Sequence, residues 1–140
     1  MVDGVYSMDG DIAKLDEICE IAHRYGALVY VDEAHSTGVI GDTGRGTPEY
    51  YHLEGKVDIV AGTCSKALGV VGGFIASSQK IIQYLYYYAR SYMFSTAPTP
   101  QAVASISEAL DVILEEPQLR EKLWQNIRYF KKDLEDLHVD

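Results

Sequence analysis

The feature that most limits the possible folds is a continuous apolar run, residues 27–31 (Ala-Leu-Val-Tyr-Val), which follows an amphipathic stretch almost directly. In that stretch apolar residues recur every three or four positions between Ile12 and Ala22, a spacing typical of a helix with one buried face. Gly26 follows it as a helix stop. An unbroken apolar run is typical of a parallel strand covered on both faces. Helix, stop and strand together predict half of a βαβ unit, and therefore an α/β fold.

The rest of the chain alternates in the same way between apolar runs and amphipathic stretches. The further elements expected are the end of a strand at residues 2–7, buried strands at 58–63 and 72–76, and helices at about 79–90, from 100 onward and from 117 onward. Thr99 and Pro100 are suitable as N-cap and first helical residue of the second of these helices. Four glycines between residues 36 and 54 predict a long loop without a regular element.

Charge and cysteine content exclude several classes of protein. The chain has 12 Lys and Arg against 21 Asp and Glu, a formal net charge of -9, so it lacks the basic face that binding to nucleic acid needs. Cys19 and Cys64 offer neither a disulfide framework nor a metal-binding spacing, as is typical of a reducing compartment. No apolar run approaches the roughly 20 residues that span a bilayer. We therefore expect a cytoplasmic protein with no membrane span and no metal.

An acidic motif, residues 32–35 (Asp-Glu-Ala-His), follows the first apolar strand, at the end where open α/β sheets bind ligands. The same four residues occur in the Walker B motif of DEAH-box helicases. A helicase also needs a phosphate-binding loop of the form GxxxxGK[ST], but Val57 follows the one Gly-Lys pair, at residues 55 and 56. The acidic charge also disfavours this alternative.

A second polar segment, residues 63–66 (Thr-Cys-Ser-Lys), follows the next strand. An acid, an imidazole, hydroxyls and a lysine at two strand ends suit pyridoxal phosphate. The lysine can form a Schiff base with the cofactor, the carboxylate can keep the pyridine nitrogen protonated, and the hydroxyls can bind the phosphate. The two motifs together therefore predict a cofactor site at one edge of the sheet.

The motifs resemble those of the α-oxoamine synthases, a family of fold-type I pyridoxal phosphate enzymes. The similar blocks are residues 31–38 (Val-Asp-Glu-Ala-His-Ser-Thr-Gly), 44–46 (Gly-Arg-Gly), 62–69 (Gly-Thr-Cys-Ser-Lys-Ala-Leu-Gly) and 72–73 (Gly-Gly). The resemblance covers essentially the whole chain. It implies the large domain of such an enzyme, with a mainly parallel sheet flanked by helices.

The resemblance also assigns roles to individual residues. It implies that Lys66 holds the cofactor and moves the proton on the substrate Cα, and that Asp32 binds the pyridinium nitrogen. His35 would contact the phenolic oxygen of the cofactor and take part in catalysis. Thr63 would supply a hydroxyl to the cofactor phosphate.

Further implications concern organisation and partners. Residues 1–97 would be the central part of the cofactor-binding domain, and residues 98–140 helices that lead toward a C-terminal domain outside this chain. Ser95 and Thr96 would reach the phosphate in the neighbouring subunit of a homodimer with shared active sites. The implied reaction condenses an amino acid with an acyl-CoA to give an aminoketone and CoA, as in 2-amino-3-ketobutyrate CoA ligase or 8-amino-7-oxononanoate synthase.

Two alternatives stay open at this point. One is another fold-type I activity, an aminotransferase or a lyase, which shares the Asp and Lys roles. The other is a non-catalytic truncated product, because the family's ring-stacking residue lies before Val2 and its carboxylate-binding arginine lies after Asp140. In addition, five tyrosines between residues 84 and 92 are expected to pack in a core or at a subunit interface.

Overall fold

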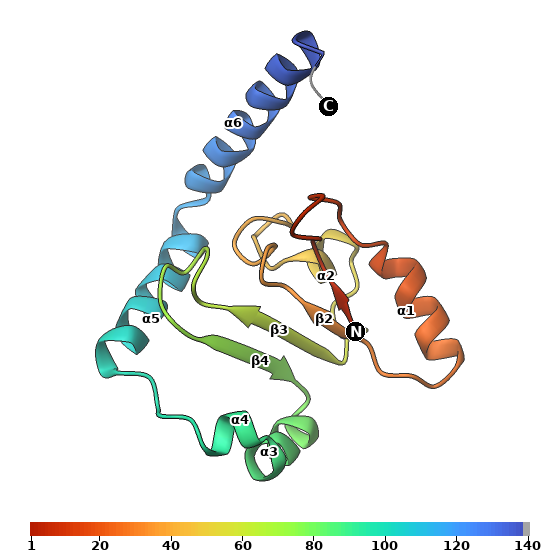
Figure 1. The fold of residues 1–140 in the computed structure, drawn as a ribbon, viewed down its shortest axis with the longest axis vertical. Helices are drawn as coiled ribbons and strands as arrows, with labels where there is room; N and C mark the ends of the chain where they lie inside the picture. Colours follow the sequence, from red (N-terminus) through yellow and green to blue (C-terminus); the bar gives the residue numbers. More distant parts are fainter. Residues whose placement is uncertain (139–140) are drawn as a thin grey trace.

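The computed structural model describes residues 1–138, which form a four-stranded sheet with helices around it (Figure 1). In chain order the elements are β1 (Val2–Asp3), α1 (Leu15–Arg24), β2 (Tyr30–Asp32), α2 (Thr47–Tyr50), β3 (Ile59–Thr63), β4 (Gly73–Ser77), α3 (Gln79–Tyr88), α4 (Arg90–Met93), α5 (Pro100–Glu115) and α6 (Pro117–Asp136). The strands lie in the order β1-β2-β3-β4; β1, β2 and β3 are parallel, and β4 is antiparallel to β3. The predicted α/β class with a mainly parallel sheet is confirmed.

The strand directions bring the polar motifs to one edge of the sheet. Because β2 and β3 are parallel, their carboxyl ends lie at the same edge, and the register pairs Asp32 with Ala61. Residues 64–72 then join β3 to β4 by a turn in which the N–H of Val70 donates to the Cys64 carbonyl at 2.8 Å. This turn carries Lys66 to the same edge of the sheet as the end of β2.

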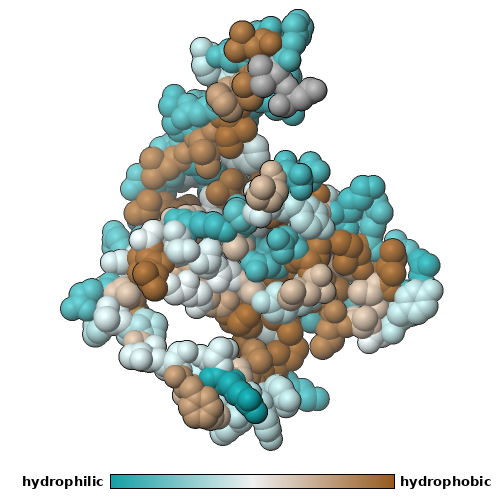
Figure 2. Space-filling view, viewed as in Figure 1, coloured by the Kyte–Doolittle hydropathy of each residue, from teal (hydrophilic) through white to brown (hydrophobic). Residues whose placement is uncertain are grey.

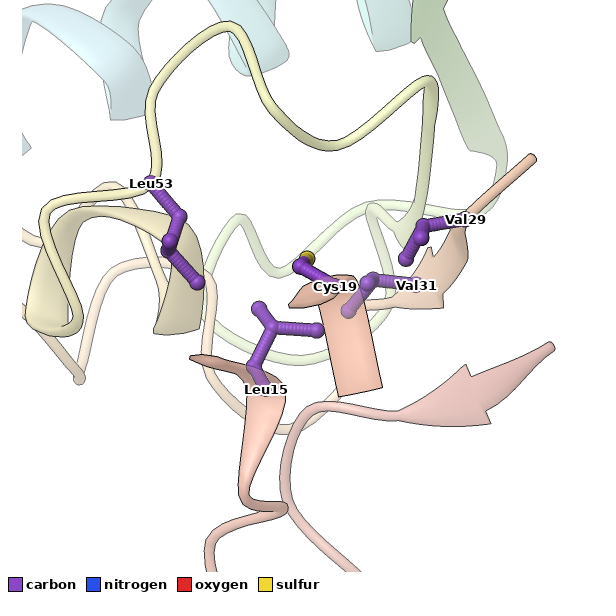
Figure 3. Packing of buried hydrophobic residues seen from close by; sticks show 5 residues of the cluster. All are labelled: Leu15, Cys19, Val29, Val31 and Leu53. Atoms are coloured by element: carbon purple, nitrogen blue, oxygen red, sulfur yellow. The ribbon is translucent and has the colours of Figure 1, made fainter. Parts of the chain in front are cut away.

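The core lies between α1 and the sheet (Figure 3). Its buried residues are Leu15 and Cys19 from α1, Val29 and Val31 from the β2 segment, and Leu53 from the loop that follows α2. The buried face predicted for this helix is therefore confirmed, although the helix begins at Leu15 and not near residue 12. Burial, with the nearby Asp58 carboxylate, raises the pKa of the Cys19 thiol, so this side chain stays neutral in the core.

The prediction that residues 36–54 form a loop without a regular element is wrong in one place. Residues 47–50 form the short helix α2, which begins with Thr47 and has Pro48 in its first turn. A proline suits this position because its φ is already helical and its missing N–H would have had no partner. Gly46, at a φ of 95°, makes the sharp entry into the helix. The number of glycines in a segment does not by itself indicate that a short helix lies within it.

Burial differs from prediction on the far side of the sheet. Residues 72–76 were expected to form a buried strand, but β4 is exposed from Gly73 to Ala76, and β3 is only half-buried around Ala61. β4 is an edge strand, and α3, α4, α5 and α6 contain no buried residue, so this face stays open. The five tyrosines between residues 84 and 92 are likewise exposed, so they do not form a core within this chain.

The C-terminal helices begin as predicted, at Pro100 and Pro117, with the Thr99 side chain accepting a hydrogen bond from the N–H of Ala102. In Figure 1, α6 projects away from the sheet, and Figure 2 shows apolar side chains along this arm. The predicted division between residues 97 and 98 stays a prediction, and positions 139 and 140 of its second part lie outside the described residues. None of the helices described in residues 1–138 is long and apolar enough to cross a membrane.

The exposed area agrees with these uncovered faces. The described chain exposes 10196 Å². A compact monomer of 15.6 kDa would expose about 7,200 Å². Exposed apolar side chains on β4, α3, α5 and α6 contribute to this excess. This conformation therefore leaves more surface uncovered than a self-contained domain of the same mass.

Candidate functional site

Two turns at the carboxyl edge of the sheet carry the predicted catalytic side chains. Lys66 follows β3 and His35 follows β2, and Nζ of Lys66 lies 2.7 Å from Nε2 of His35. A protonated lysine has only donors, so in that state Nε2 of His35 accepts and the ring proton sits on Nδ1. Both side chains are exposed to solvent. The fold thus joins an amine and an imidazole that are 31 positions apart in the sequence.

Asp32 is the last residue of β2 and is half-buried. Its Oδ1 accepts a hydrogen bond of 2.9 Å from the N–H of Ala34, which fixes the side chain within the turn. Asp32 and Ala34 both line a cavity of about 790 Å³ between the sheet and α3. The carboxylate therefore stands at the wall of a space large enough for a small cofactor.

Thr63, at the end of β3, lines the same cavity and belongs to a cluster of hydroxyl and amide groups. Its Oγ1 lies 2.7 Å from Oγ of Ser65 and accepts a hydrogen bond of 3.2 Å from the N–H of Ser65. Hydroxyls and backbone N–H groups of this kind bind phosphate well. Ser65 belongs to the motif whose hydroxyls are predicted to bind the phosphate, and its Oγ lies beside that of Thr63.

The rest of the cavity is largely apolar. Its wall includes Ala61 of β3, Phe74 of β4 and Tyr30 of β2. The Phe74 ring lies so close over Gly62 that a side chain at residue 62 would collide with it. Burial, with the neighbouring Asp32 carboxylate, raises the pKa of the Tyr30 phenol, which keeps this hydroxyl neutral.

Ser95 and Thr96 are not brought to this cavity. Both are exposed, in the extended stretch that follows α4, and neither is among the described residues that line the cavity. The Ser95 hydroxyl donates instead to the Ser91 carbonyl, one turn earlier. The predicted role of these two residues concerns a neighbouring subunit and stays a prediction.

Glu33 is the principal residue of the site that sequence reasoning did not assign. It lies between Asp32 and Ala34, which line the cavity, yet Glu33 is fully buried and does not line it. Its carboxylate accepts hydrogen bonds from the Ser36 hydroxyl and from the N–H and hydroxyl of Thr47. The available signal was an acid directly after a buried strand with a serine three residues later, but Thr47 is 14 positions away.

The loop after the motif is held by three further side chains, one from α2 and two from α6. The Glu49 carboxylate accepts hydrogen bonds from the N–H and hydroxyl of Thr43 and from the N–H of Arg45. From α6, the Arg120 guanidinium donates to the Thr43 carbonyl at 3.2 Å and to a second loop carbonyl at 2.6 Å. Trp124 Nε1, also from α6, donates to the Val39 carbonyl at 3.0 Å. Arg45 therefore helps to hold this loop through its backbone N–H.

No group of three or more His, Cys, Asp and Glu side chains within residues 1–138 is arranged to hold a metal ion. The polar groups at the sheet edge instead comprise one amine, one imidazole, one carboxylate and two hydroxyls. This donor set fits an organic cofactor with an aldehyde, a ring nitrogen and a phosphate.

Comparison with known proteins supports the same conclusion. The family model described as aminotransferase class I and II matches residues 1–140. The 8-amino-7-oxononanoate synthase of Thermoanaerobacter pseudethanolicus is 49% identical over 140 residues, which are the whole of this chain and 35% of that protein. The chain thus spans about a third of the length of the curated relatives it matches.

Two solved structures share the fold. The serine palmitoyltransferase of S. paucimobilis with bound PLP-myriocin aldimine has a TM-score of 0.92 at 40% identity, over 96% of this chain and 34% of that one. The 8-amino-7-oxononanoate synthase of Francisella tularensis has a TM-score of 0.86 at 30% identity, over 99% of this chain and 41% of that one. The chain therefore belongs to the class I and II aminotransferase family, in the α-oxoamine synthase group that its sequence motifs resemble.

Proposed function

We propose that this chain provides the lysine and most of one cofactor-binding wall of a pyridoxal phosphate enzyme that condenses an amino acid with an acyl-CoA. The products would be an aminoketone and CoA. The observation that carries the proposal is the 2.7 Å contact of Lys66 with His35 at the sheet edge that also presents Asp32 and Thr63. The names of the relatives, 8-amino-7-oxononanoate synthase and serine palmitoyltransferase, support the acyl-transfer chemistry.

The residues present fit the cofactor group by group. Asp32 would hold the protonated pyridine nitrogen, because its carboxylate stands at the cavity wall and is fixed by the Ala34 N–H. Ala34 itself is small enough to let a flat ring lie close. The Thr63 and Ser65 hydroxyls would receive the phosphate, and His35 would contact the phenolic oxygen. In these assignments the residues at the end of β2 would contact the ring nitrogen and the phenolic oxygen of the cofactor, and the residues at the end of β3 would contact its phosphate.

When bound, pyridoxal phosphate supplies an electrophilic carbon and a ring that stabilises negative charge on a substrate carbon. Lys66 attaches the cofactor through Nζ and afterwards holds or moves a proton at that atom. When Nζ is protonated, His35 Nε2 accepts its hydrogen bond, so the imidazole can keep the amine oriented and take up its proton. Asp32 keeps a proton on the ring nitrogen by its negative charge.

The partners proposed are an amino acid, an acyl-CoA and a second copy of the chain in a cytoplasmic homodimer. The tyrosines of α3 and α4 pack on one another in pairs, Tyr84 with Tyr88 and Tyr86 with Tyr92, yet they stay exposed, as do Ser95 and Thr96. These uncovered side chains support a subunit contact. Aromatic residues with one polar end are common at such contacts. An aminotransferase would use the same lysine and carboxylate, so the assay must separate the two reactions.

The first experiment tests covalent attachment. The protein is mixed with pyridoxal phosphate, reduced with borohydride and digested, and the modified lysine is located by mass spectrometry. We expect the adduct on Lys66 and its loss in Lys66→Ala, whereas Lys56→Ala, at another exposed lysine, serves as the control and keeps it. An adduct spread over surface lysines in wild type and Lys66→Ala alike would refute the assignment.

A second assay separates acyl transfer from transamination. Release of CoA is measured with candidate amino acids in the presence and absence of an acyl-CoA, beside the formation of keto acid. CoA release that requires both substrates supports the proposal. Keto acid formed without any acyl-CoA would assign the protein to the aminotransferases instead.

A further inference from the structure

The turn that carries His35 is organised around a carboxylate that does not face the cofactor site. Glu33 has no exposed surface, whereas His35, two residues later, is exposed. Burying an ionised carboxylate is costly unless hydrogen bonds replace the lost water. Glu33 receives such bonds from Ser36 Oγ at 2.5 Å, from the Thr47 N–H at 2.7 Å and from the Thr47 hydroxyl.

The surrounding backbone leaves room for this carboxylate and no more. A Cβ on Gly4 would collide with Oε1 of Glu33, and a Cβ on Gly46 would collide with Oε2. Gly4 also extends the β1–β2 pairing, because its N–H donates to the Asp32 carbonyl at 2.8 Å. Three separate segments, around residues 4, 36 and 47, therefore close on one side chain.

The main chain of Glu33 is fixed as firmly as its side chain. Its N–H donates to the Ala61 carbonyl at 2.7 Å, which continues the β2–β3 ladder, and its carbonyl accepts from Ser36 and Thr37. Residues 33 and 36 thus both point inward and are fully buried. His35 lies between these two buried residues and is exposed, and its Nε2 is 2.7 Å from Nζ of Lys66.

We infer that Glu33 is a positioning residue: its buried carboxylate locks the turn after β2 so that Asp32 and His35 keep the orientation that cofactor binding needs. The expected effect on cofactor binding rests on the proposed function, whereas the packing around Glu33 does not depend on it. Glu33 does not line the cavity, and its carboxylate is hydrogen-bonded to Ser36 and Thr47, so it acts on the site through its neighbours. The hydrogen bonds of Glu33 join the turn to Thr47 of α2, and Gly4, which follows β1, is bonded to the Asp32 carbonyl, so both elements help to hold the turn.

The test compares Glu33→Gln with Glu49→Gln. The two carboxylates each accept three hydrogen bonds in the same loop region, but Glu49 lies at the outer end, away from His35. An amide in place of Glu33 turns one acceptor into a donor that faces the Ser36 and Thr47 donors. We expect pyridoxal phosphate to dissociate about tenfold more readily from Glu33→Gln, the loss of one strong hydrogen bond, and less than about twofold more readily from Glu49→Gln.

A readout without cofactor separates positioning from general destabilisation. The nitrogen chemical shifts of the His35 ring report its tautomer and its hydrogen bond to Lys66. They should change in Glu33→Gln and stay at wild-type values in Glu49→Gln, at a temperature where both variants are folded. Unchanged His35 shifts in folded Glu33→Gln would overturn the inference.

Milder variants keep the test decisive if Glu33→Gln does not fold. Ser36→Ala and Thr47→Val each remove one hydroxyl donor to Glu33 and leave the carboxylate in place. Each should shift the His35 signals in the same direction, by less than Glu33→Gln would, and a wild-type spectrum in both would refute the inference. If wild type forms no adduct on Lys66 while these His35 shifts respond, the proposed function fails and the positioning role stands.

Discussion

Replacing Gly4 by alanine tests how tightly the buried carboxylate is enclosed. Gly4 is buried and its φ is not in the left-handed region, so the backbone accepts alanine and the effect comes from the added methyl group. That methyl group would overlap Oε1 of Glu33 and lie 2.7 Å from Oγ1 of Thr47. Either the carboxylate moves and loses its hydrogen bond to Thr47, or β1 shifts away from β2.

The expected cost combines two terms and one offset. Overpacking a tight interior costs about 1–3 kcal/mol. Weakening a hydrogen bond to a charged group costs about 1.5–3 kcal/mol. The smaller conformational freedom of alanine in the unfolded chain returns about 0.5–1 kcal/mol. We therefore expect Gly4→Ala to lower the free energy of unfolding by about 1.5–5.5 kcal/mol, out of the roughly 5–15 kcal/mol of a typical domain.

The assay is urea unfolding followed by circular dichroism, with Gly10→Ala as the control. Gly10 has a φ of 76° and nothing within 4 Å of its added Cβ, so its cost is backbone strain alone, about 1–2 kcal/mol. A second control removes the obstacle: in a Glu33→Ala background, Gly4→Ala should cost at least about 1 kcal/mol less than in wild type. If Gly4→Ala costs no more than Gly10→Ala, or the same with and without Glu33, the enclosure is not what the structure describes.

Two further predictions concern the loop that follows the motif. Burial opposes ionisation of Glu49, but hydrogen bonds from Thr43 and Arg45 outweigh it and lower the pKa of this carboxyl. Its stabilising contribution is therefore present above its ordinary pKa of 4.5 and is lost as the pH falls through the lower folded value; Glu49→Gln should flatten the acid side of the stability curve measured by thermal unfolding, and an unchanged slope would contradict the shift. Arg120→Ala should speed hydrogen exchange in residues 39–45 by about tenfold, because it removes two hydrogen bonds to loop carbonyls. Arg128→Ala, about two turns further along α6, is the control, and equal exchange in both variants would show that α6 does not restrain the loop.

The sequence was sufficient to predict what depends on neighbouring residues. Apolar periodicity and capping located the helices that begin at Pro100 and Pro117, and the polar segments after two apolar runs located the edge where Lys66 and His35 meet. Parallel strands oblige such segments to share an edge, so no knowledge of distant contacts was needed. This is why the motif was sufficient for the candidate site.

The errors arise where the outcome depends on residues far apart or on surfaces outside the chain. Apolar content predicts that β4 is covered, but it does not say by what, and within residues 1–138 the strand stays exposed from Gly73 to Ala76. The role of Glu33 depends on Thr47, and the glycine-rich segment between them hides the helix that supplies this partner. Likewise, the hydrogen bond from Trp124 to the Val39 carbonyl joins positions 85 residues apart, a pairing that periodicity cannot indicate.

The hydrogen bonds from α6 to the loop couple movement of this helix to movement of the loop. Its 20 residues form a helix about 30 Å long that starts at Pro117. The hydrogen bond from Trp124 to the Val39 carbonyl lies only about 10 Å along the helix from Pro117. A tilt of about ten degrees at Pro117 displaces the far end by roughly 5 Å and Trp124 by roughly 2 Å, enough to break a hydrogen bond. A movement of the distal end of α6 is therefore transmitted, with a smaller amplitude, to the loop that follows the Asp-Glu-Ala-His motif.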